Sequence, residues 1–427
     1  QSLDSGCVPK DWRVANISPI YKKGDKSTAS NYRPVSVTSI CSKLIEHIVF
    51  SHIMDHYDQH KILVNNQHGF RQGRSCETQL IITTHGLAKA LNDKGQVDAV
   101  VLDFSKAFDR VPHMRLQLKL HHYGIRGALH TWIGKFLTTR LQRVVIDGKS
   151  SEWTPVSSGV PQGTVLGPLL FLSYINDIPS GITSNIRLFA DDCLIYRTIN
   201  NISDTIALQA DLSRLHEWST KWQMRFNTEK CHTLQFSLRR KTIDASYHLG
   251  DSVLTTVTDY PYLGLTFTNS MSWGKHIDKA TARANRILGL IRRNLRGSSH
   301  KLKETAYVSL VRPHLEYCSS IWNPHTKKDI YRVEIIQRRA ARFVTHNYQR
   351  RASVTAMLEE LGWSSLESRR QLASLCFLYK IQHQLVAIDP ALYLTPMVTS
   401  STRSYHPLKF MLIPSRIQLY SNSFFPR

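Results

Sequence analysis

The stretch "LFADDCLIY", residues Leu188–Tyr196, places two adjacent carboxylates, Asp191 and Asp192, inside an otherwise apolar run. The apolar residues on both sides, within "NIRLFADDCLIYR", predict a β-hairpin that carries both acids at its turn. Adjacent carboxylates repel each other and resist desolvation, so in an apolar setting they need a cation or must give up charge. Asp also favours turns for purely local reasons. The pair alone therefore leaves a structural and a functional interpretation equally open.

A third acid, Asp103, follows a second apolar run. Val97–Leu102 is short and rich in β-formers, which is typical of a buried strand that ends at an acid. We expect Asp103 to converge with the hairpin at one edge of a sheet. Carboxylate oxygens from two strands suit Mg²⁺ whose remaining ligands are water and substrate phosphates. The three acids therefore favour two-metal phosphoryl transfer.

The composition indicates a polyanionic partner. The 427 residues predict two or three domains, and 55 Lys and Arg against 32 Asp and Glu give a formal net charge of +23. Nucleic acid is the first interpretation and an anionic membrane surface the second. The longest apolar stretch, Val165–Ile175, is much shorter than the roughly 20 residues of a membrane helix. We therefore expect no membrane partner.

The cysteines and the glycines exclude several kinds of site. Seven cysteines are scattered singly without a C-x-x-C pair, so neither a disulfide framework nor a zinc knuckle is predicted, and a reducing compartment fits best. No glycine loop of the Walker or dinucleotide type occurs. The chain starts at Gln1 without a leader-like segment and ends at "SFFPR", so we expect an internal fragment that is truncated at its carboxy end.

Strand and helix patterns alternate without regular βαβ units, which predicts an α+β fold. Apolar residues recur at helical spacing through "PLLFLSYIND" after "GVPQG", and in residues 42–56, 114–123 and 128–137. Two extended pieces, "RVVIDG" and "EWTPVSS", are joined by an Asp-Gly turn signal.

From about His276 the pattern becomes helical and basic. One helical face carries apolar residues, namely Ile277, Ala280, Ala284, Leu288, Ile291 and Leu295. Residues 281–350 hold 15 Lys and Arg but 4 Asp and Glu, a local excess of +11. Solvated helical faces usually intersperse acids with bases, and here they do not. The segment therefore favours binding to a nucleic-acid backbone over a plain solvated surface.

Seven sequence blocks in one order identify a resemblance. The chain resembles the reverse transcriptase of non-LTR (LINE-type) retrotransposons, most closely the jockey-like group, through "NYRPVSVTSICSKLIEHIV", "QHGFRQGRSCETQL", "VVLDFSKAFDRVPH", "SSGVPQGTVLGPLLFLSYIND", "FADD", "KWQMRFNTEKCHTLQF" and "YLGLTF". These blocks cover roughly Asp11–Phe267. The basic helical segment that follows, to about Asn347, is similar to the family's thumb.

The resemblance implies a right-hand polymerase with fingers, a palm built on an antiparallel sheet, and a basic all-helical thumb. We expect the amino-terminal part of the fingers at 1–96, the palm with inserted fingers helices at 97–265, the thumb at 266–347, and a carboxy-terminal extension at 348–427.

For the catalytic acids, the resemblance implies that Asp103 and Asp191 are the principal ligands of two Mg²⁺ ions, with Mn²⁺ as a substitute. Asp192 would be the third acid, with a less direct role. Phe104 would supply its backbone carbonyl to the metal.

The nucleotide site is implied in the same way. Phe108 matches the family's steric gate against ribonucleotides, although core packing explains a phenylalanine equally well without the motif. The other implied dNTP-binding residues are Gln162 and Gly163 in "PQG", Arg33 in "NYRP", Lys22 or Lys23 in "YKKGD", and Lys230 in "FNTEK", a candidate general acid. A solvated turn is the alternative for Lys22 and Lys23.

Template and primer contacts are implied for two basic groups and one hairpin. The basic groups are Arg71 and Arg74 in "GFRQGRS", and the thumb arginines Arg283, Arg286, Arg292 and Arg293. "YLGL" would support the primer end.

The implied activity is an RNA-directed DNA polymerase that copies an RNA template from a DNA 3′-OH primer with dNTPs, by target-primed reverse transcription. A separate endonuclease domain is expected upstream and is absent from this chain. Copying at a chromosomal nick implies the nucleus during integration and the cytoplasm while bound to RNA. The alternatives are an RNA-templated RNA polymerase, against which the bulk of Phe108 argues, and a catalytically inactive RNA-binding protein.

Overall fold

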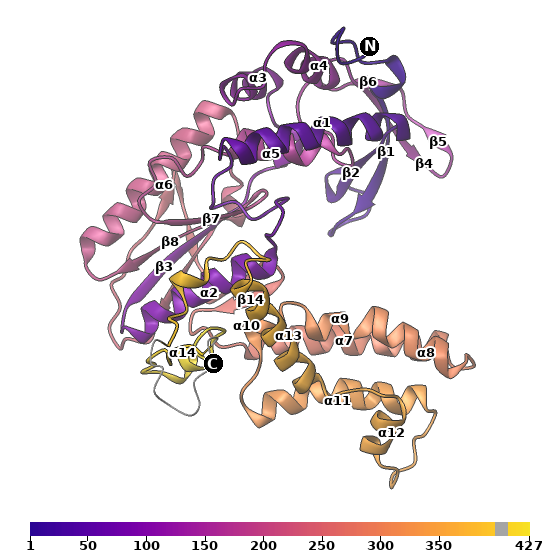
Figure 1. Cartoon of the computed structure of the whole chain (residues 1–427), viewed down its shortest axis with the longest axis vertical. Helices are drawn as coiled ribbons and strands as arrows, with labels where there is room; N and C mark the ends of the chain where they lie inside the picture. The colour runs from indigo at the N-terminus through magenta and orange to yellow at the C-terminus, as the bar shows by residue number, and fades with distance from the viewer. Residues whose placement is uncertain (398–408) are drawn as a thin grey trace.

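A five-stranded sheet lies at the centre of the computed structural model, which describes residues 1–397 and 409–427 (Figure 1). Its strand order is β12, β9, β3, β8, β7, spanning Thr255–Thr256, His232–Ser237, Gln96–Leu102, Asp192–Ile199 and Asn185–Phe189. The β12–β9 pair is parallel and the other pairs are antiparallel. The predicted buried strand and the predicted hairpin are therefore confirmed, and they are neighbours in one sheet.

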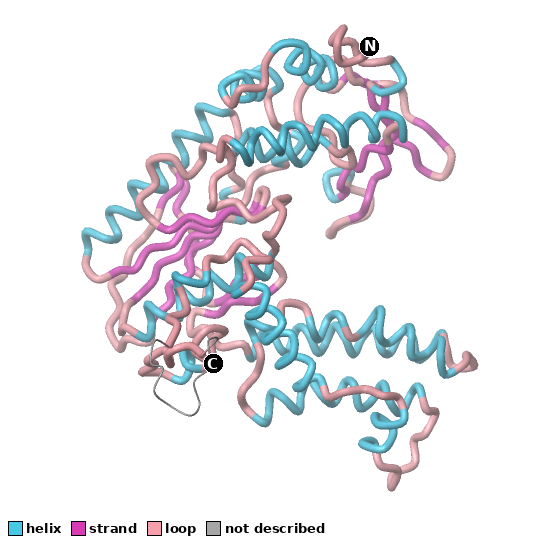
Figure 2. The backbone as a smooth tube through the Cα atoms, in the orientation of Figure 1, coloured by secondary structure: helices cyan, strands magenta, loops and turns pink. Residues whose placement is uncertain are grey.

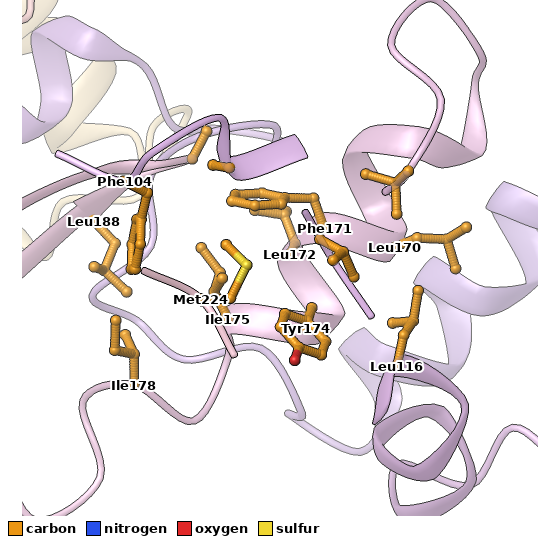
Figure 3. Close-up of a cluster of buried hydrophobic side chains, with 14 of the residues drawn as sticks. Phe104, Leu116, Leu170, Phe171, Leu172, Tyr174, Ile175, Ile178, Leu188 and Met224 are labelled. Carbon is orange, nitrogen blue, oxygen red and sulfur yellow. The ribbon is translucent and has the colours of Figure 1, made fainter. Parts of the chain in front are cut away.

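Each face of this sheet covers a separate hydrophobic core. Side chains alternate along a strand, so Val100 and Leu102 of β3 enter one core while Val97, Ala99 and Val101 enter the other. The first core contains α5 (Leu166–Ile175), which is apolar on all sides and buried along nearly its whole length. Figure 3 shows ten labelled members of this core, Phe104, Leu116, Leu170, Phe171, Leu172, Tyr174, Ile175, Ile178, Leu188 and Met224.

A mixed lobe lies on one side of the sheet. Its own sheet combines β1 (Val14–Tyr21) and β2 (Tyr32–Val37) with the distant strands β4 (Leu141–Ile146), β5 (Lys149–Ser150) and β6 (Thr154–Pro155). The lobe also holds α1 (Ile40–Gln59), α3 (His113–His122) and α4 (Gly127–Thr138), which confirm the three helices predicted from apolar spacing, and the short 3-10 helices η1 (Lys10–Trp12) and η2 (Ala29–Asn31).

The helix α2 (Cys76–Asn92) packs on the second face of the central sheet rather than in the mixed lobe. Ser75 begins it with a capping box, in which its side chain accepts a hydrogen bond from the Thr78 amide and the Thr78 side chain accepts one from the Ser75 amide. The helix α6 (Ile202–Trp222) covers the first face, near the small hairpin β10 (His248–Leu249) and β11 (Ser252–Val253). The predicted domain boundaries stay predictions.

A helical lobe follows the hairpin β13 (Asp259–Tyr262) and β14 (Leu265–Thr268), and Figure 2 shows helices and loops throughout it. Its helices are α7 (Gly274–Asn294), α8 (His300–Ala306), a π-helix (Tyr307–Val311), α9 (Pro313–Glu316), α10 (Ser319–Trp322) and α11 (Lys327–Val344). Ile277, Ala284, Leu288 and Ile291 are buried on α7, as the helical pattern predicted.

The carboxy-terminal segment runs back to the central sheet. After α12 (Val354–Glu360) and α13 (Leu366–Gln382), the amide of Ala387 donates to the carbonyl of Gly73 at 2.8 Å. Further on, the amide of Arg416 donates to Asn92 Oδ1 at 2.7 Å, so Ala387 is bonded just before the beginning of α2 and Arg416 at its end. The last short helices are η6 (Pro390–Leu392) and α14 (Gln418–Ser421). Within the described residues, no helix is both long and apolar enough to cross a bilayer.

Candidate active site

Strand register brings the three acids together at one end of the central sheet. The final pair in the register of β3 and β8 is Leu102 with Cys193, so the next residues along the two strands are Asp103 and Asp192. Alternation places both on the face that carries Val101 and Leu194. Asp191 lies beside them in the two-residue turn between β7 and β8.

The acids are close enough to perturb one another. Burial raises the pKa of Asp191, and the charge of Asp103 raises it further. Burial raises the pKa of Asp192 to about 6, with additional contributions from the charges of Asp191 and Asp103. The charges of neighbouring acids therefore disfavour ionisation of Asp191 and Asp192, as expected where carboxylates gather in a partly buried site.

One lysine partly neutralises the cluster. Lys230 Nζ lies 2.9 Å from Asp103 Oδ2, and its side chain remains about half exposed. The Asn227 amide donates to the Asp103 carbonyl at 2.7 Å, and the Ser105 amide donates to the Arg225 carbonyl at 2.9 Å. Lys230 ends the short helix η4 (Thr228–Lys230), so these bonds fix it beside Asp103.

The same bonds fix Phe104. Its ring is buried and stacks on Phe226 with a centroid separation of 4.3 Å. Neither of the two backbone bonds around it uses the Phe104 carbonyl, which is the atom predicted to contact metal.

The donor set fits a divalent cation that takes part of its coordination shell from elsewhere. Among residues 1–397 and 409–427, no three His, Cys, Asp or Glu side chains are gathered closely enough to hold a metal ion by themselves. The acids nevertheless offer hard carboxylate oxygens, and a bound cation would relieve their mutual repulsion. Mg²⁺ commonly binds through one or two carboxylates plus water and substrate phosphates.

Phe108 is held firmly by its neighbours. It belongs to the 3-10 helix η3 (Ala107–Asp109), and its ring stacks on Phe171 of α5 at 4.2 Å with an interplanar angle of 16°. Phe70 contacts it edge-on at 6.3 Å, and its carbonyl accepts a hydrogen bond from the Val160 amide at 2.7 Å. The aromatic ring is therefore both packed in the core and fixed in orientation.

The loop that carries Gln162 and Gly163 is attached to the mixed lobe. The Ser36 amide of β2 donates to the Gln162 carbonyl at 2.7 Å. Gly163 has φ of 102°, and a Cβ there would lie 2.5 Å from the Ser36 carbonyl oxygen, so only glycine fits without displacement. Gln162 Nε2 donates to Asp109 Oδ1 at 2.9 Å.

Asp109 is a site residue that the motif analysis missed. Burial raises its pKa, while hydrogen bonding to Gln162 and the charges of Lys106, Lys22 and Arg33 oppose that rise. The signal in the sequence was a second carboxylate in "DFSKAFDR", six residues after Asp103.

The predicted triphosphate-binding cations lie on the β1–β2 hairpin. Arg33 pairs with Ile20 across it, and Lys22 and Lys23 follow the end of β1. The charges of Arg33 and Lys22 lower the pKa of Asp191, so both cations act on the acid cluster across the site. Lys23 is exposed at the turn.

Arg71 and Arg74 hold a neighbouring loop. Arg71 Nη1 donates to the Val64 carbonyl at 2.7 Å, and Arg74 Nη1 donates to the Asn65 carbonyl at 2.6 Å. Burial lowers the pKa of both guanidinium groups, that of Arg74 to about 10. The structure thus gives both residues a role in fixing residues 63–65, and the predicted template contact stays a prediction.

The "YLGL" turn joins the acid site to the helical lobe. Leu263 and Gly264 have φ values of 45° and 83°, and Tyr317 donates its hydroxyl to the Leu263 carbonyl at 3.1 Å. In the same hairpin, the Tyr260 hydroxyl donates to the Lys230 carbonyl at 3.2 Å. The β13–β14 hairpin therefore contacts both the segment that carries Lys230 and the helical lobe.

The four predicted thumb arginines lie exposed on α7, namely Arg283, Arg286, Arg292 and Arg293. None of them forms an ion pair within the described part of the chain. Helical spacing places Arg283, Arg286 and Arg293 on one face with Lys279, whereas Arg292 lies over the Tyr348 ring at 5.7 Å.

Because the pKa of Asp192 is raised, replacing its carboxylate by a neutral group should increase the free energy of unfolding by an amount that depends on pH. Because the folded state binds this proton more tightly than the unfolded state, the stabilisation is full below the ordinary value of 3.8 and is lost as pH rises through about 6. Asp192→Asn should therefore raise the free energy of unfolding by about 1–3 kcal/mol near pH 8 without metal, and by much less near pH 4.5. Urea unfolding in EDTA measures both, with the exposed Asp251→Asn as control. An equal gain at both pH values would contradict the assignment.

Comparison with known proteins identifies the family. Residues 20–267 match the family model "Reverse transcriptase (RNA-dependent DNA polymerase)". The "Probable RNA-directed DNA polymerase from transposon BS" of Drosophila melanogaster is 29% identical over 357 residues, covering 79% of this chain and 39% of that protein. The "RNA-directed DNA polymerase from mobile element jockey" of the same species is 28% identical over 359 residues, covering 80% and 39%. The chain thus spans about two fifths of the length of these relatives.

Among solved structures, apo telomerase from Candida tropicalis aligns with a TM-score of 0.48 at 11% identity, covering 80% of this chain and 60% of that one. The family match covers 248 of the 427 residues, from 20 to 267. The chain therefore belongs to the reverse transcriptase (RNA-dependent DNA polymerase) family.

Proposed function

We propose that this chain is the polymerase core of a non-LTR retrotransposon reverse transcriptase, which extends a DNA 3′-OH primer on an RNA template by target-primed reverse transcription. The observation that carries the proposal is the convergence of Asp103, Asp191 and Asp192 at one end of the central sheet. In the reaction, the primer 3′-hydroxyl attacks the α-phosphate of a dNTP, a new P–O bond forms, and pyrophosphate leaves.

Reverse transcriptase domains use divalent metal ions, and we propose two Mg²⁺ ions for this site. Asp103 and Asp191 would hold them, with the Phe104 carbonyl as a further ligand and Asp192 as a supporting charge. When bound, such ions activate the attacking hydroxyl and stabilise the leaving group. Their charge also removes the repulsion that raises the pKa of Asp191 and Asp192.

The residues around the acids would bind and orient the nucleotide. Arg33 and Lys22 would grip the triphosphate, as their influence on Asp191 supports, and Lys23 would add a weaker contact. Gln162 and Gly163 would pack on the nucleotide. Lys230, already 2.9 Å from Asp103, would hold a proton for the departing pyrophosphate.

Phe108 favours a DNA polymerase over an RNA-templated RNA polymerase. Its ring is stacked on Phe171 and fixed through its own backbone, so it would lie rigidly against the sugar C2′ and leave no room for a 2′-hydroxyl. A ribonucleotide polymerase needs that room. The intact acid trio argues against the other alternative, a catalytically inactive RNA-binding protein.

Primer extension tests this proposal. On poly(rA)/oligo(dT) with Mg²⁺, the wild type should incorporate dTTP, and Asp191→Asn should lose activity by at least about 10³-fold because a principal metal ligand is removed. RNA binding by Asp191→Asn, measured by filter retention, should remain at the wild-type level.

Two outcomes would contradict the proposal. Extension by the wild type no better than by Asp191→Asn, with equal RNA binding, would favour a binding protein. Equal incorporation of UTP and dTTP by the wild type would favour an RNA polymerase and would remove the steric role of Phe108.

For the nucleic acid, we propose that α7 binds the template–primer duplex through Arg283, Arg286, Arg292 and Arg293, and that Arg71 and Arg74 contact the template. The four thumb arginines are exposed, and they are free of ion pairs in the part of the chain that the structure describes. Arg71 and Arg74 use part of their donor capacity on residues 64 and 65, so their contact with the template would be secondary.

Salt dependence tests the α7 surface. Replacing Arg283 and Arg286 together with alanine should lower the slope of log K against log[salt] for RNA–DNA duplex binding by about 1.5, because two phosphate contacts are lost. The matched control is Lys149→Ala, an exposed cation on β5 in the other lobe. An unchanged slope for the double variant, or an equal fall for the control, would contradict the assignment.

We further propose, from the family alone, that an endonuclease domain upstream supplies the target nick. On the same basis the protein would act in the nucleus during integration and accompany its RNA in the cytoplasm.

A further inference from the structure

The turn that presents Asp191 has an unfavourable backbone conformation. Only Ala190 and Asp191 lie between β7 and β8, and Phe189 already pairs with Asp192. Ala190 has φ of 51°, in the left-handed region that non-glycine residues rarely adopt. Such a conformation persists only when the surroundings hold it in place.

A single side chain outside the hairpin pairs with both polar groups of Ala190. Gln67 Oε1 accepts a hydrogen bond from the Ala190 amide at 2.8 Å, and Gln67 Nε2 donates to the Ala190 carbonyl at 3.4 Å. Gln67 lies 123 residues earlier in the chain and is 2% exposed, so water does not compete for these bonds.

Gln67 is itself fixed on the edge of the central sheet. The Leu188 amide donates to the Asn66 carbonyl at 2.9 Å, and the His68 amide donates to the Leu188 carbonyl at 2.8 Å, so residues 66–68 extend the sheet beside β7. Gln67 Oε1 also accepts from the Gly69 amide at 2.8 Å. A Cβ on Gly69 would overlap the Ala190 amide nitrogen, so the close approach requires glycine.

This edge segment is in turn tied to α2. His68 Nδ1 and Thr78 Oγ1 are hydrogen-bonded at 2.8 Å, and Thr78 is part of the capping box that begins the helix. Gln67 therefore connects the turn to a helix as well as to the sheet.

We propose that Gln67 is a positioning residue that holds the Ala190–Asp191 turn in the conformation in which Asp191 binds metal. Gln67 acts through the Ala190 peptide and touches neither substrate nor metal. The inference rests on the proposed function, because it assumes that Asp191 is a metal ligand. Gln67 also gives a role to "QHGF", the beginning of the motif in which Arg71 and Arg74 were predicted to contact the template.

Gln67→Met tests the proposal because methionine keeps the length and burial of the side chain but removes both hydrogen bonds to Ala190, together with the one from the Gly69 amide. In metal-free protein, the Ala190 amide should lose protection from hydrogen exchange. Mn²⁺ affinity, measured by electron paramagnetic resonance on the protein alone, should fall by about 10–100-fold, the usual cost of removing a group that orients a metal ligand. Gln67→Glu keeps an acceptor for the amide and should keep the protection.

Asn66→Ala is the matched control. Its side chain donates to the Ile186 carbonyl on the same edge at 3.0 Å, away from the turn. It should leave Mn²⁺ affinity and Ala190 protection unchanged. The proposal would be overturned if Gln67→Met kept the wild-type Mn²⁺ affinity and the wild-type protection of the Ala190 amide. It would also be overturned if Asn66→Ala lost as much Mn²⁺ affinity as Gln67→Met. If Gln67→Met does not fold, loss of Ala190 protection in folded Gln67→Glu would overturn it. Failure of the proposed function would appear separately, because wild type and Asp191→Asn would then bind Mn²⁺ equally well.

Discussion

The pairing of β3 with β8 is the constraint on which the rest of this structure depends. Seven residue pairs, from Gln96 with Ile199 to Leu102 with Cys193, set a register in which Asp103 and Asp192 come next. A shift of one residue would turn every side chain to the opposite face and would separate the acids from each other. The buried apolar residues on both faces prevent that shift, because each face belongs to a core of its own.

The same sheet brings the carboxylates close enough to repel one another. Burial raises the pKa of Asp191 and Asp192, and the charge of Asp103 adds to both shifts. Lys230 relieves part of it, and the hairpin cations Arg33 and Lys22 act from across the site. Repulsion among these carboxylates favours the binding of a cation between them. This agrees with the use of divalent metal ions by the family.

Much of this architecture could be predicted from the sequence because it depends on local patterns. The apolar runs before Asp103 and around Asp191 predicted the strands, and helical spacing predicted α1, α3, α4 and α7 within a few residues. The α+β fold and the membership of the reverse transcriptase family are confirmed, and the jockey element's RNA-directed DNA polymerase is among the relatives that the chain matches.

What the sequence did not reveal depends on contacts between distant residues. Gln67 meets Ala190 across 123 positions, and no local pattern marks that bond. The hydrogen bonds from Arg71 and Arg74 to nearby carbonyls could not be predicted either. An arginine that binds its own loop and one that faces solvent stand in the same kind of sequence. The attachment of the carboxy-terminal segment near the two ends of α2 depends on single bonds such as that from Ala387 to Gly73.

The central claim is that Asp103, directly after β3, and Asp191, in the turn between β7 and β8, share a bound metal ion. A double-mutant cycle on Mn²⁺ affinity tests it most directly, with Asp103→Asn, Asp191→Asn and the double variant measured by electron paramagnetic resonance. The account predicts strong coupling, of about 1–3 kcal/mol, because each single substitution already breaks the shared site and the second costs little more. Losses that add within about 0.5 kcal/mol would show that the two acids act independently and would contradict the account.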